Sequence, residues 1–189
     1  MTMQLNDMNL ADLPDAVKRP TYDRSALTPG IVHIGVGNFH RAHQAWYQHR
    51  LLSRVLARDW AIIGAGVRPY DEAMRKKLSQ QDYMTTLIAL DPKGSDVEVV
   101  GSMISYVPVE VGHGALVRQM ADPAIRIVSL TVTEGGYYVD PVTGQCDLSH
   151  PDLLHDVAHP DHPKTAFGAI VRALRLRRDA GQNPFSCLC

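Results

Sequence analysis

The sequence predicts an α/β fold, in which a doubly wound, mostly parallel sheet carries an inserted β-hairpin. Three observations predict it: apolar runs of strand length alternate with stretches of helical periodicity, a glycine turn follows the first apolar run, and two neighbouring β-rich runs interrupt the alternation. The 189 residues are 45% hydrophobic and 21% charged. A chain of this length and composition can bury a core of its own.

The first strand and helix follow an irregular start. Residues 9–17 are predicted to form a short amphipathic helix, and irregular chain follows up to the Thr-Pro-Gly of residues 28–30. Residues 31–34 are mainly β-branched and stand directly before a glycine turn, which predicts a buried strand. Apolar residues then recur at helical spacing over residues 39–56. Together these patterns predict a strand, a glycine turn and a helix.

The next elements repeat this order and then depart from it. The apolar run at residues 60–67 predicts a second strand, and the charged stretch at residues 71–78 predicts a helix. Residues 83–90 and 97–107 are rich in β-forming residues and flank the turn sequence Asp-Pro-Lys-Gly-Ser. They predict an antiparallel hairpin inserted into the alternating pattern.

The alternating pattern then resumes. Residues 114–120 have helical periodicity, and the dense apolar run at residues 125–132 is typical of a central parallel strand covered on both faces. A long amphipathic helix is predicted for residues 164–178. The residues after Gly181 are β-prone, so the chain is expected to stop inside a further strand.

We expect two parts in the chain: an amino-terminal extension over residues 1–29, and one Rossmann-like domain over residues 30–189 that is truncated at its carboxyl end. The formal net charge of -1 and the isoelectric point near 6.7 argue against nucleic acid and anionic membranes as partners. No apolar run approaches about 18 residues, and the acidic start does not resemble a signal peptide. Three cysteines without metal or disulfide spacing suit a reducing, cytoplasmic location.

Gly35 and Gly37 lie between the first predicted strand and its helix. In this geometry the free amides at the start of the helix, together with the helix dipole, attract a pyrophosphate. Gly35 would allow a tight turn, and Gly37 would let phosphates approach the backbone without a β-carbon in the way. The common dinucleotide fingerprint has a third glycine where this sequence has His40. The alternative is a glycine turn without a ligand.

An acidic residue after the second strand is the next expected feature, because a carboxylate there accepts hydrogen bonds from the adenosine ribose. Asp71 matches best, with Asp59 and Asp82 as competitors. A carboxylate disfavours a ribose 2′-phosphate through like-charge repulsion, while Arg68 and Arg75 would soften that preference. The sequence therefore predicts NAD as the preferred cofactor. The alternative is that Asp71 only caps the following helix.

The sequence is similar to the long-chain polyol dehydrogenases that group around mannitol 2-dehydrogenase. The similarity covers nearly the whole chain and rests on IVHIGVGNFHRAHQ (residues 31–44), GAGVRPYDEAMRKKLSQQDY (64–83), IRIVSLTVTEGGY (125–137) and HPKTAFGAIVRAL (162–174). The first and third stretches are specific to the family. In that family the dinucleotide loop reads G-x-G-x-F-H-R-A-H-Q, so His40 belongs to the family pattern.

The resemblance implies site residues on three segments. The pyrophosphate and the nicotinamide side would be lined by Gly35, Gly37, Asn38 and Phe39. The loop would be shaped by Arg41 and His43, and the adenosine ribose would lie at Asp71. Near the nicotinamide and the substrate would lie Thr133, Glu134 and Gly135. Glu134 would orient water or relay a proton as an auxiliary catalytic residue, unless it only caps the next turn.

The resemblance also implies hydride exchange between a nicotinamide cofactor and a small-molecule polyol or ketose, such as mannitol and fructose, without a metal. In the family a lysine is the general base, in a pattern like K-x-x-x-x-N-x-x-H. That spacing is missing after Lys18, Lys76, Lys77, Lys93 and Lys164. We therefore expect the general base and the carboxyl-terminal helical substrate domain to be absent, and the chain alone to have negligible turnover.

Two further groups of residues have alternative interpretations. His155 and His159 stand at the i, i+4 spacing of a metal-binding pair, but prolines interrupt the segment, which favours a solvated polar connection over a metal site. The arginines of the last helix are expected on its wet face, with docking of a partner domain as the alternative: Arg172, Arg175, Arg177 and Arg178. An apolar face left by the missing domain would favour self-association.

Three other functions stay open at this point. Hexuronate reductases of the fructuronate type share the opening loop, so this chain would then be a fragment of such an enzyme. A second hypothesis is a nucleotide-binding remnant without catalysis. A methyltransferase, which also combines a glycine-rich turn with an acid after its second strand, is the third.

Overall fold

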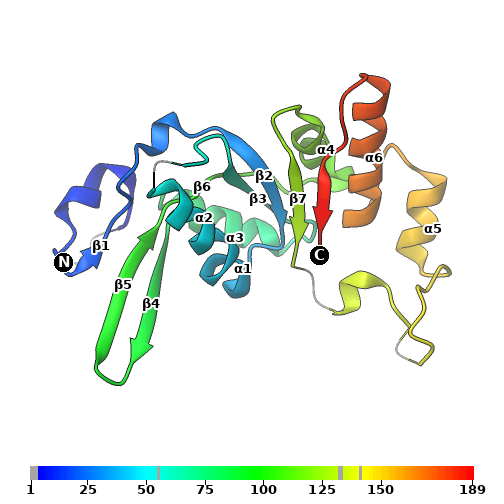
Figure 1. Ribbon diagram of the computed structural model, residues 1–189. Helices are drawn as coiled ribbons and strands as arrows, with labels where there is room; N and C mark the ends of the chain where they lie inside the picture. The colour runs from blue at the N-terminus through cyan, green and yellow to red at the C-terminus, as the bar shows by residue number, and fades with distance from the viewer. Residues whose placement is uncertain (1–3, 55, 132–133, 141) are drawn as a thin grey trace.

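The computed structural model describes residues 4–189 apart from residues 55, 132–133 and 141 and the side chains of residues 134–135. Five parallel strands form the main sheet, in the order β6-β3-β2-β7-β8. They are β2 (Pro29–Ile34), β3 (Ala61–Ala65), β6 (Met103–Tyr106), β7 (Ile127–Leu130) and β8 (Ser186–Leu188). From β2 the chain builds toward one edge and later returns to build toward the other (Figure 1). The predicted doubly wound α/β fold is confirmed.

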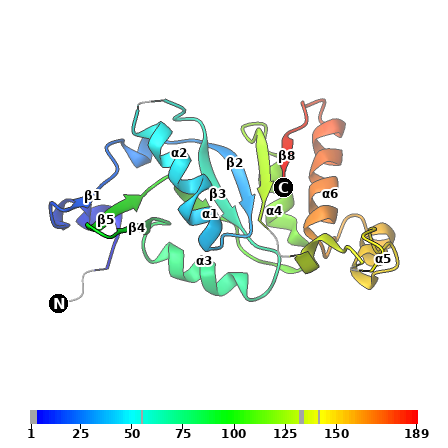
Figure 2. The same cartoon turned by 60° about the horizontal axis from the view of Figure 1, so that its bottom comes forward.

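Helices cover both faces of this sheet (Figure 2). On one face lie α1 (Asn38–Ala42), α2 (Gln44–Leu52) and α3 (Asp71–Ser79). On the other face lie α4 (Gly114–Ala121) and α6 (Ala166–Asp179), with α5 (Pro151–Ala158) beyond α6. The described residues also form four short 3-10 helices: η1 (Asp7–Asp12), η2 (Arg24–Ala26), η3 (Val111–His113) and η4 (Glu134–Tyr137).

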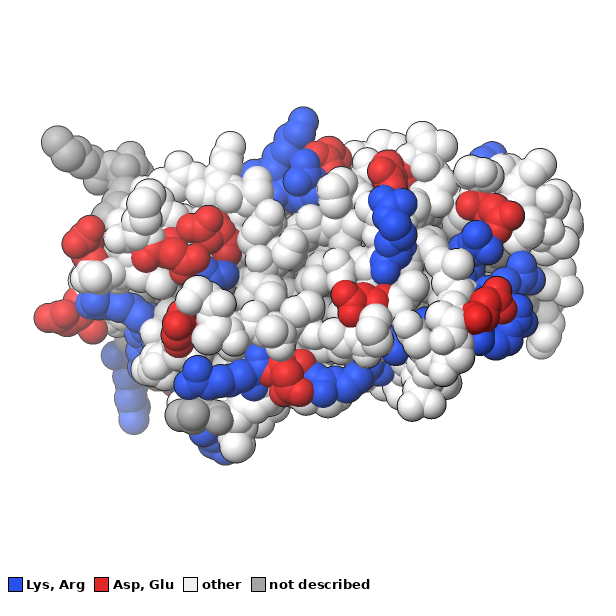
Figure 3. Space-filling view, turned by 90° about the horizontal axis from the view of Figure 1, so that it is seen from above, with Lys and Arg blue, Asp and Glu red and all other residues white. Residues whose placement is uncertain are grey.

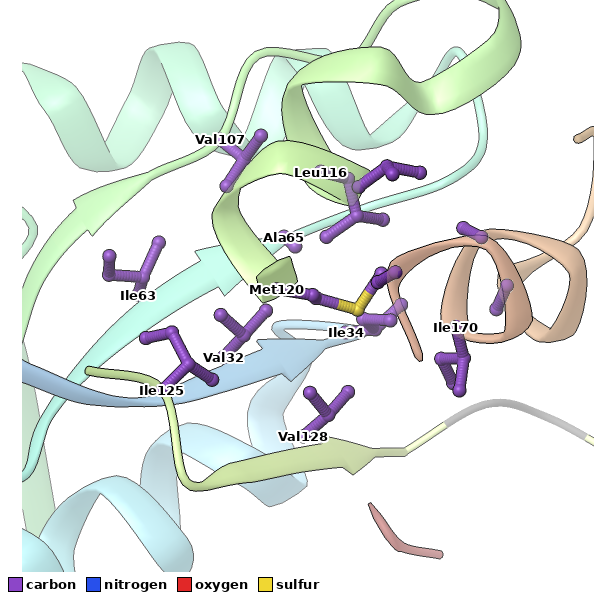
Figure 4. Close-up of a cluster of buried hydrophobic side chains, with 14 of the residues drawn as sticks. Val32, Ile34, Ile63, Ala65, Val107, Leu116, Met120, Ile125, Val128 and Ile170 are labelled. Carbon is purple, nitrogen blue, oxygen red and sulfur yellow. The ribbon is translucent and has the colours of Figure 1, made fainter. Parts of the chain in front are cut away.

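Alternate residues of the central strands divide the core into two layers. The layer under α4 and α6 includes Val32, Ile34, Leu116, Met120 and Ile170 (Figure 4). The layer under α2 and α3 includes Ile31, Ile62, Ala45 and Leu78. Because both faces of β2 and β3 are buried, their sequences are continuous apolar runs rather than alternating ones. The carboxyl ends of the strands are left for the site.

The single helix predicted over residues 39–56 is wrong. α1 ends at Ala42 and α2 begins at Gln44, with His43 between them at φ -119° and ψ -84°. The His43 ring lies 2.9 Å from the carbonyl oxygen of Phe39 and stacks on the Phe39 ring at 4.3 Å. The Phe39 carbonyl also accepts from the His43 amide at 3.0 Å, so this helical bond is kept and the break lies in the non-helical backbone conformation of His43.

The helix predicted over residues 9–17 is also wrong. η1 ends at Asp12, and the chain then turns, with the Val17 amide donating to the Pro14 carbonyl at 2.9 Å. Proline in the middle of the predicted helix interrupts it. The next two residues form β1 (Val17–Lys18), which pairs in parallel with β5 of the hairpin.

The predicted hairpin is confirmed for its first part only. β4 (Thr85–Asp91) and β5 (Gly94–Val100) pair antiparallel and project from the body in Figure 1. The predicted second run, residues 97–107, belongs to two sheets, because Met103–Tyr106 is β6 of the parallel sheet. The run divides at Gly101, where a β-carbon would lie 2.9 Å from Pro20 and 3.0 Å from Arg24. The Gly101 carbonyl accepts a bond from Arg24 Nε at 3.0 Å.

Buried polar contacts attach the amino-terminal segment to the body. The Tyr22 hydroxyl lies 2.7 Å from His49 Nδ1, and His49 Nε2 lies 3.5 Å from Glu98. Trp46 Nε1 donates to Glu98 at 2.7 Å. These contacts join the segment before β2 to α2 and β5, so the described part of residues 1–29 packs on the fold.

β8 pairs in parallel with β7, which confirms the strand expected after Gly181.

Arg177, in the last turn of α6, is buried. It is 4% exposed, so the expectation that this arginine lies on the solvent-facing side of the helix is wrong. Its Nη1 donates to the carbonyls of Met120, Asp122 and Ile125 at 2.8–3.2 Å, and its Nε donates to Asn183 at 2.8 Å. Helical periodicity predicts that Arg177 faces solvent. In the fold its guanidinium is instead surrounded by backbone carbonyls at the end of α4 and in the connection to β7.

Replacing Arg177 by methionine is expected to lower the free energy of unfolding by about 3 kcal/mol, because buried carbonyls lose charge-assisted donors. Urea unfolding followed by circular dichroism measures the change. Arg178→Met is the matched control, since that guanidinium contacts the exposed Asp179 and its loss should cost less than about 0.5 kcal/mol. Equal effects of the two substitutions would contradict the assignment.

The surface gives two further observations. On the face seen in Figure 3, the described basic and acidic side chains are intermixed rather than gathered by sign. Within the described residues, no helix has the length and apolar character required to span a bilayer.

Candidate functional site

A cleft of about 830 Å³ lies at the carboxyl ends of β2 and β7, where the strand order reverses. Open α/β sheets bind ligands at this position. The glycine turn after β2, the loop between β3 and α3 with one side of α3, the end of β6, the residues after β7 and the residues that lead into α6 all line it. Among the sequence-predicted site residues, it brings together Gly35, Gly37, Arg68 and Asp71.

Gly35 makes the turn after β2 possible. Its φ is +97°, and a β-carbon there would lie 2.5 Å from the carbonyl oxygen of Thr131, at the end of β7. Its amide donates to the Ala65 carbonyl at the end of β3, at 3.0 Å. No other residue type meets both requirements, since only glycine adopts this conformation without strain and without a β-carbon.

Gly37 leaves open space above the turn. A β-carbon there would meet no heavy atom closer than the Gly35 oxygen at 4.0 Å. The Gly37 amide itself donates to the Gly35 carbonyl at 2.7 Å, so it is used within the turn. The next amides, of Asn38 and Phe39, open α1, where the first turn of a helix has no backbone partners and no side chain caps it.

Arg41 donates hydrogen bonds to both sides of the glycine turn. It donates to the Val36 carbonyl at 3.2 Å and to the side-chain oxygen of Asn38 at 2.5 Å. Burial lowers the pKa of Arg41, although the group stays a cation at neutral pH. Asn38 and Phe39 are exposed on α1 beside the cleft, where Phe39 packs against the His43 ring.

Asp71 holds the loop after β3. Its Oδ2 accepts bonds from the amides of Val67 and Arg68, each at 2.9 Å, and Oδ1 takes part in neither. A β-carbon on Gly66 would lie 2.2 Å from that of Asp71, so the loop closes tightly on the carboxylate. The alternative that Asp71 caps α3 is wrong, because its carboxylate bonds amides that precede the helix.

The two competing acids lie elsewhere. Asp59 forms an ion pair with Arg126 at 2.7 Å at the other end of the sheet. Asp82 accepts a bond from the Asp7 amide at 2.9 Å, under the amino-terminal segment. Neither of them lines the cleft, so of these three acids only Asp71 does.

The structure does not describe the side chains of the predicted site residues that follow β7. Thr133 lies outside the described residues, and Glu134 and Gly135 are described only as the start of η4. Their neighbours Thr131, Gly136 and Tyr138 do line the cleft. The segment that follows β7 therefore borders the site, as the resemblance implies.

Residue-by-residue reasoning missed the far wall of the cleft. Lys164, Thr165 and Tyr138 line it, although Lys164 was considered only as a general base. Thr165 caps α6 by accepting from the Gly168 amide at 2.9 Å, and its hydroxyl donates to Asp156 at 2.6 Å. The family stretch at residues 162–174 was the available signal for these residues, because it contains the end of the connection from β7 and the start of α6. Sequence spacing did not show that this connection lines the same cleft as the glycine turn.

The histidine-rich segment forms α5 rather than only a polar connection. The rings of His155 and His159 lie 4.7 Å apart, and Asp156 is engaged by Thr165. Across the part of the chain that the structure describes, no three metal-ligating side chains gather in one place.

The model of the mannitol dehydrogenase Rossmann domain matches residues 29–189. The chain belongs to the mannitol dehydrogenase family. The mannitol 2-dehydrogenase of Cereibacter sphaeroides is 60% identical over 173 residues, which are 92% of this chain and 36% of that protein. A polyol:NADP oxidoreductase of Gluconobacter oxydans is 42% identical over 95% of this chain and 37% of its own length.

A solved structure extends this similarity to the fold. Pseudomonas fluorescens mannitol 2-dehydrogenase, in a ternary complex with NAD and D-mannitol, matches this mannitol dehydrogenase domain with a TM-score of 0.91 at 44% identity. The match covers 98% of this chain and 38% of that one. The chain thus spans little more than a third of the length of these relatives. The family resemblance found in the sequence is confirmed, and neither the methyltransferase nor the hexuronate reductase hypothesis is favoured.

Proposed function

We propose that this chain is the NAD-binding portion of a mannitol 2-dehydrogenase-like oxidoreductase that interconverts D-mannitol and D-fructose, or related polyols and ketoses. The observation that carries the proposal is the glycine turn at the strand switch point, where Gly35 closes the turn and the uncapped amides of α1 follow directly. The binding of NAD and D-mannitol by the Pseudomonas relative supports it.

The residues of the turn fit a pyrophosphate. The amides of Asn38 and Phe39 at the positive end of α1 have no partner among the described residues, and the open space above Gly37 admits phosphate oxygens to the backbone. Arg41 fixes Asn38 and Val36 in this arrangement and adds positive charge. A bound NAD would supply the hydride acceptor, and the residues of this chain would bind and orient it.

The other candidate residues take roles along the same cleft. Asp71 would accept hydrogen bonds from the adenosine ribose, with Arg68 beside it, and Thr133, Glu134 and Gly135 would border the nicotinamide. Glu134 would orient water or relay a proton there. We also infer that the remainder of the relatives' length supplies the general base, because no lysine of this chain stands in the expected pattern. Residues 1–29 and 30–189 would then be the extension and the binding domain.

A direct test measures NADH binding and turnover with the same protein. We expect saturable quenching of tryptophan fluorescence by NADH, because Trp46 belongs to the layer under the turn, and no mannitol oxidation above background. Measurable oxidation would show that a general base has been overlooked. Failure to bind NADH at millimolar concentration would contradict the proposal itself, provided that circular dichroism shows a folded chain.

Replacing Asp71 by asparagine is expected to raise the affinity for NADPH relative to NADH by at least about tenfold. The amide oxygen still accepts from Val67 and Arg68, whereas the charge that repels a 2′-phosphate is lost. Competitive titration with both dinucleotides measures the ratio. Asp59→Asn is the matched control outside the cleft. An unchanged ratio in Asp71→Asn would remove Asp71 from the adenosine site.

Self-association is a further part of the proposal. Leu154 and Val157 on α5 are 54% and 81% exposed, and Leu188 on the edge strand β8 is 51% exposed. Apolar side chains and an unpaired strand edge on one side of the chain favour contact between copies. Sedimentation velocity over a range of concentrations tests this, and a concentration-independent monomer would contradict it.

A further inference from the structure

Two buried histidine rings lie under the glycine turn and have no part in the proposal above. His33 comes from β2 and His40 from α1, and each is 1% exposed. Their ring centroids are 3.6 Å apart, and the ring planes differ by 7°, so the rings are stacked face to face. Burial disfavours the charged form of both imidazoles and lowers the pKa of each.

His33 makes directed contacts with both strands that border the cleft. Its Nε2 lies 3.2 Å from the Gly35 carbonyl oxygen and 3.0 Å from the Thr131 hydroxyl, and its Nδ1 lies 2.8 Å from the Ser129 hydroxyl. A carbonyl oxygen only accepts, so the contact with Gly35 is a hydrogen bond in the tautomer that carries the proton on Nε2. The Thr131 hydroxyl also donates to the Gly35 carbonyl, at 2.7 Å. The Gly35 peptide is therefore held from β2 and from β7.

His40 fills the space that a third glycine leaves empty in the common fingerprint. That glycine lets the helix pack closely on the strand, whereas here a ring occupies the gap and lies flat on His33. Neither ring nitrogen of His40 has a hydrogen-bond partner among the described residues. The ring therefore acts through packing, by fixing the plane of the His33 ring.

We propose that His33 is a positioning residue for dinucleotide binding, and that the His33–His40 stack takes over the role of the missing third glycine. Through Nε2, His33 fixes the Gly35 peptide, and with it the direction of the amides that follow in the turn. His40 keeps the His33 ring in the orientation that makes this bond. The inference rests on the proposed function, because it concerns the turn that binds the pyrophosphate.

The test compares ligands with and without a pyrophosphate on four proteins. His33→Phe keeps a stacking ring but loses the bonds to Gly35 and Thr131, and we expect it to bind NADH and ADP-ribose at least tenfold more weakly. Adenosine, which lacks phosphates, should bind as it does to wild type in ligand-observed NMR. His33→Gln, which can still donate to Gly35 but does not stack on His40, should bind NADH more tightly than His33→Phe and more weakly than wild type. His40→Phe keeps the stack and should also stay within threefold.

The outcomes separate this inference from the proposed function. If wild type does not bind NADH, the proposed function fails. If wild type binds NADH and His33→Phe binds it within threefold, the positioning role is overturned. An equal loss for adenosine and ADP-ribose also overturns it, since general damage to the fold affects both. Should His33→Phe fail to fold, Ser129→Ala decides, because Ser129 contacts His33 Nδ1 and does not line the cleft: a loss of at least fivefold for ADP-ribose supports the role, and unchanged binding overturns it.

Discussion

Replacing Gly35 by alanine is expected to weaken NADH binding by at least about 100-fold and to lower the free energy of unfolding by about 3 kcal/mol. The backbone there has φ +97°, which costs a residue with a β-carbon about 1–2 kcal/mol. The added carbon would also lie 2.5 Å from the Thr131 carbonyl oxygen. Overpacking of this kind typically costs about 1–3 kcal/mol.

The clash cannot be relieved without moving the site. Thr131 directly follows β7, and its amide donates to the Ile34 carbonyl at 3.0 Å, so the two strand ends are joined beside Gly35. If Gly35 moves, the Gly35 peptide and the first amides of α1 turn away from the cleft. Binding is therefore expected to fall by more than the loss of stability alone explains.

Gly144→Ala is the matched control for this substitution. Gly144 also has a positive φ, +68°, but a β-carbon there meets nothing within 4 Å. This variant should lose about 1 kcal/mol and bind NADH as wild type does. Urea unfolding gives the stability of both variants, and fluorescence titration gives their affinities. NADH affinity of Gly35→Ala within tenfold of wild type would contradict the turn as the pyrophosphate site.

The sequence was sufficient for the features that depend on neighbouring residues. The apolar runs predicted β2, β3 and β7, and the pair Gly35 and Gly37 predicted a turn at which the structure has a cleft. Asp71 was chosen over Asp59 and Asp82 from its position after the second strand, and it alone of the three lines the cleft. In each case a local pattern and a general rule of α/β sheets gave the answer.

The features that were missed depend on contacts between distant segments. Arg177 has the helical spacing of a solvent-facing residue, yet carbonyls more than 50 residues away surround it. The β-rich run at residues 97–107 is continuous in sequence, but Gly101 packs against Pro20 and Arg24, and the chain changes sheet there. The helix break at His43 lies in the backbone conformation of a single residue, which periodicity does not reveal.

The stacked histidines show the same limit at the site itself. The sequence shows that His40 stands in place of a third glycine. It does not show that His33 is its stacking partner, because His33 occupies a position in a buried strand like any of its neighbours. Only the parallel pairing of β2 with β7 brings Ser129 and Thr131 to the His33 ring. A buried histidine inside an apolar strand was the signal available for a polar cluster.

These histidines also predict a marked dependence of stability on pH. Burial lowers the pKa of His33 to about 4 and that of His40 to about 2, the latter with help from His33 and Arg41. In the unfolded chain both titrate near 6.5. Between pH 7 and pH 5 the unfolded state therefore takes up protons that the folded state does not, so acidification favours unfolding. The free energy of unfolding is expected to fall by about 2 kcal/mol for each ring, or about 4 kcal/mol together.

The interval from pH 7 to pH 5 isolates this effect. Carboxylates that are stabilised in the fold, such as Glu72, whose pKa Arg75 lowers to about 2, lose their contribution only as the pH falls through the range near 4 where unfolded carboxyl groups titrate. His49 acts in the same direction as the stacked pair, because burial lowers its pKa despite the nearby Glu98. The free energy of unfolding should therefore decline steadily between pH 7 and pH 5, before the pH reaches the range in which the carboxylates titrate.

His40→Phe supplies the decisive comparison, because it keeps a ring against His33 and removes one titrating group. Its free energy of unfolding should fall by about 2 kcal/mol less than that of wild type between pH 7 and pH 5. Urea unfolding at the two pH values, followed by circular dichroism, measures both changes. If wild type and His40→Phe lose the same stability, His40 takes up a proton in the fold as readily as in the unfolded chain, so its ring is not held unsolvated against His33. A flat stack of two neutral imidazoles could then not be what fixes the Gly35 peptide.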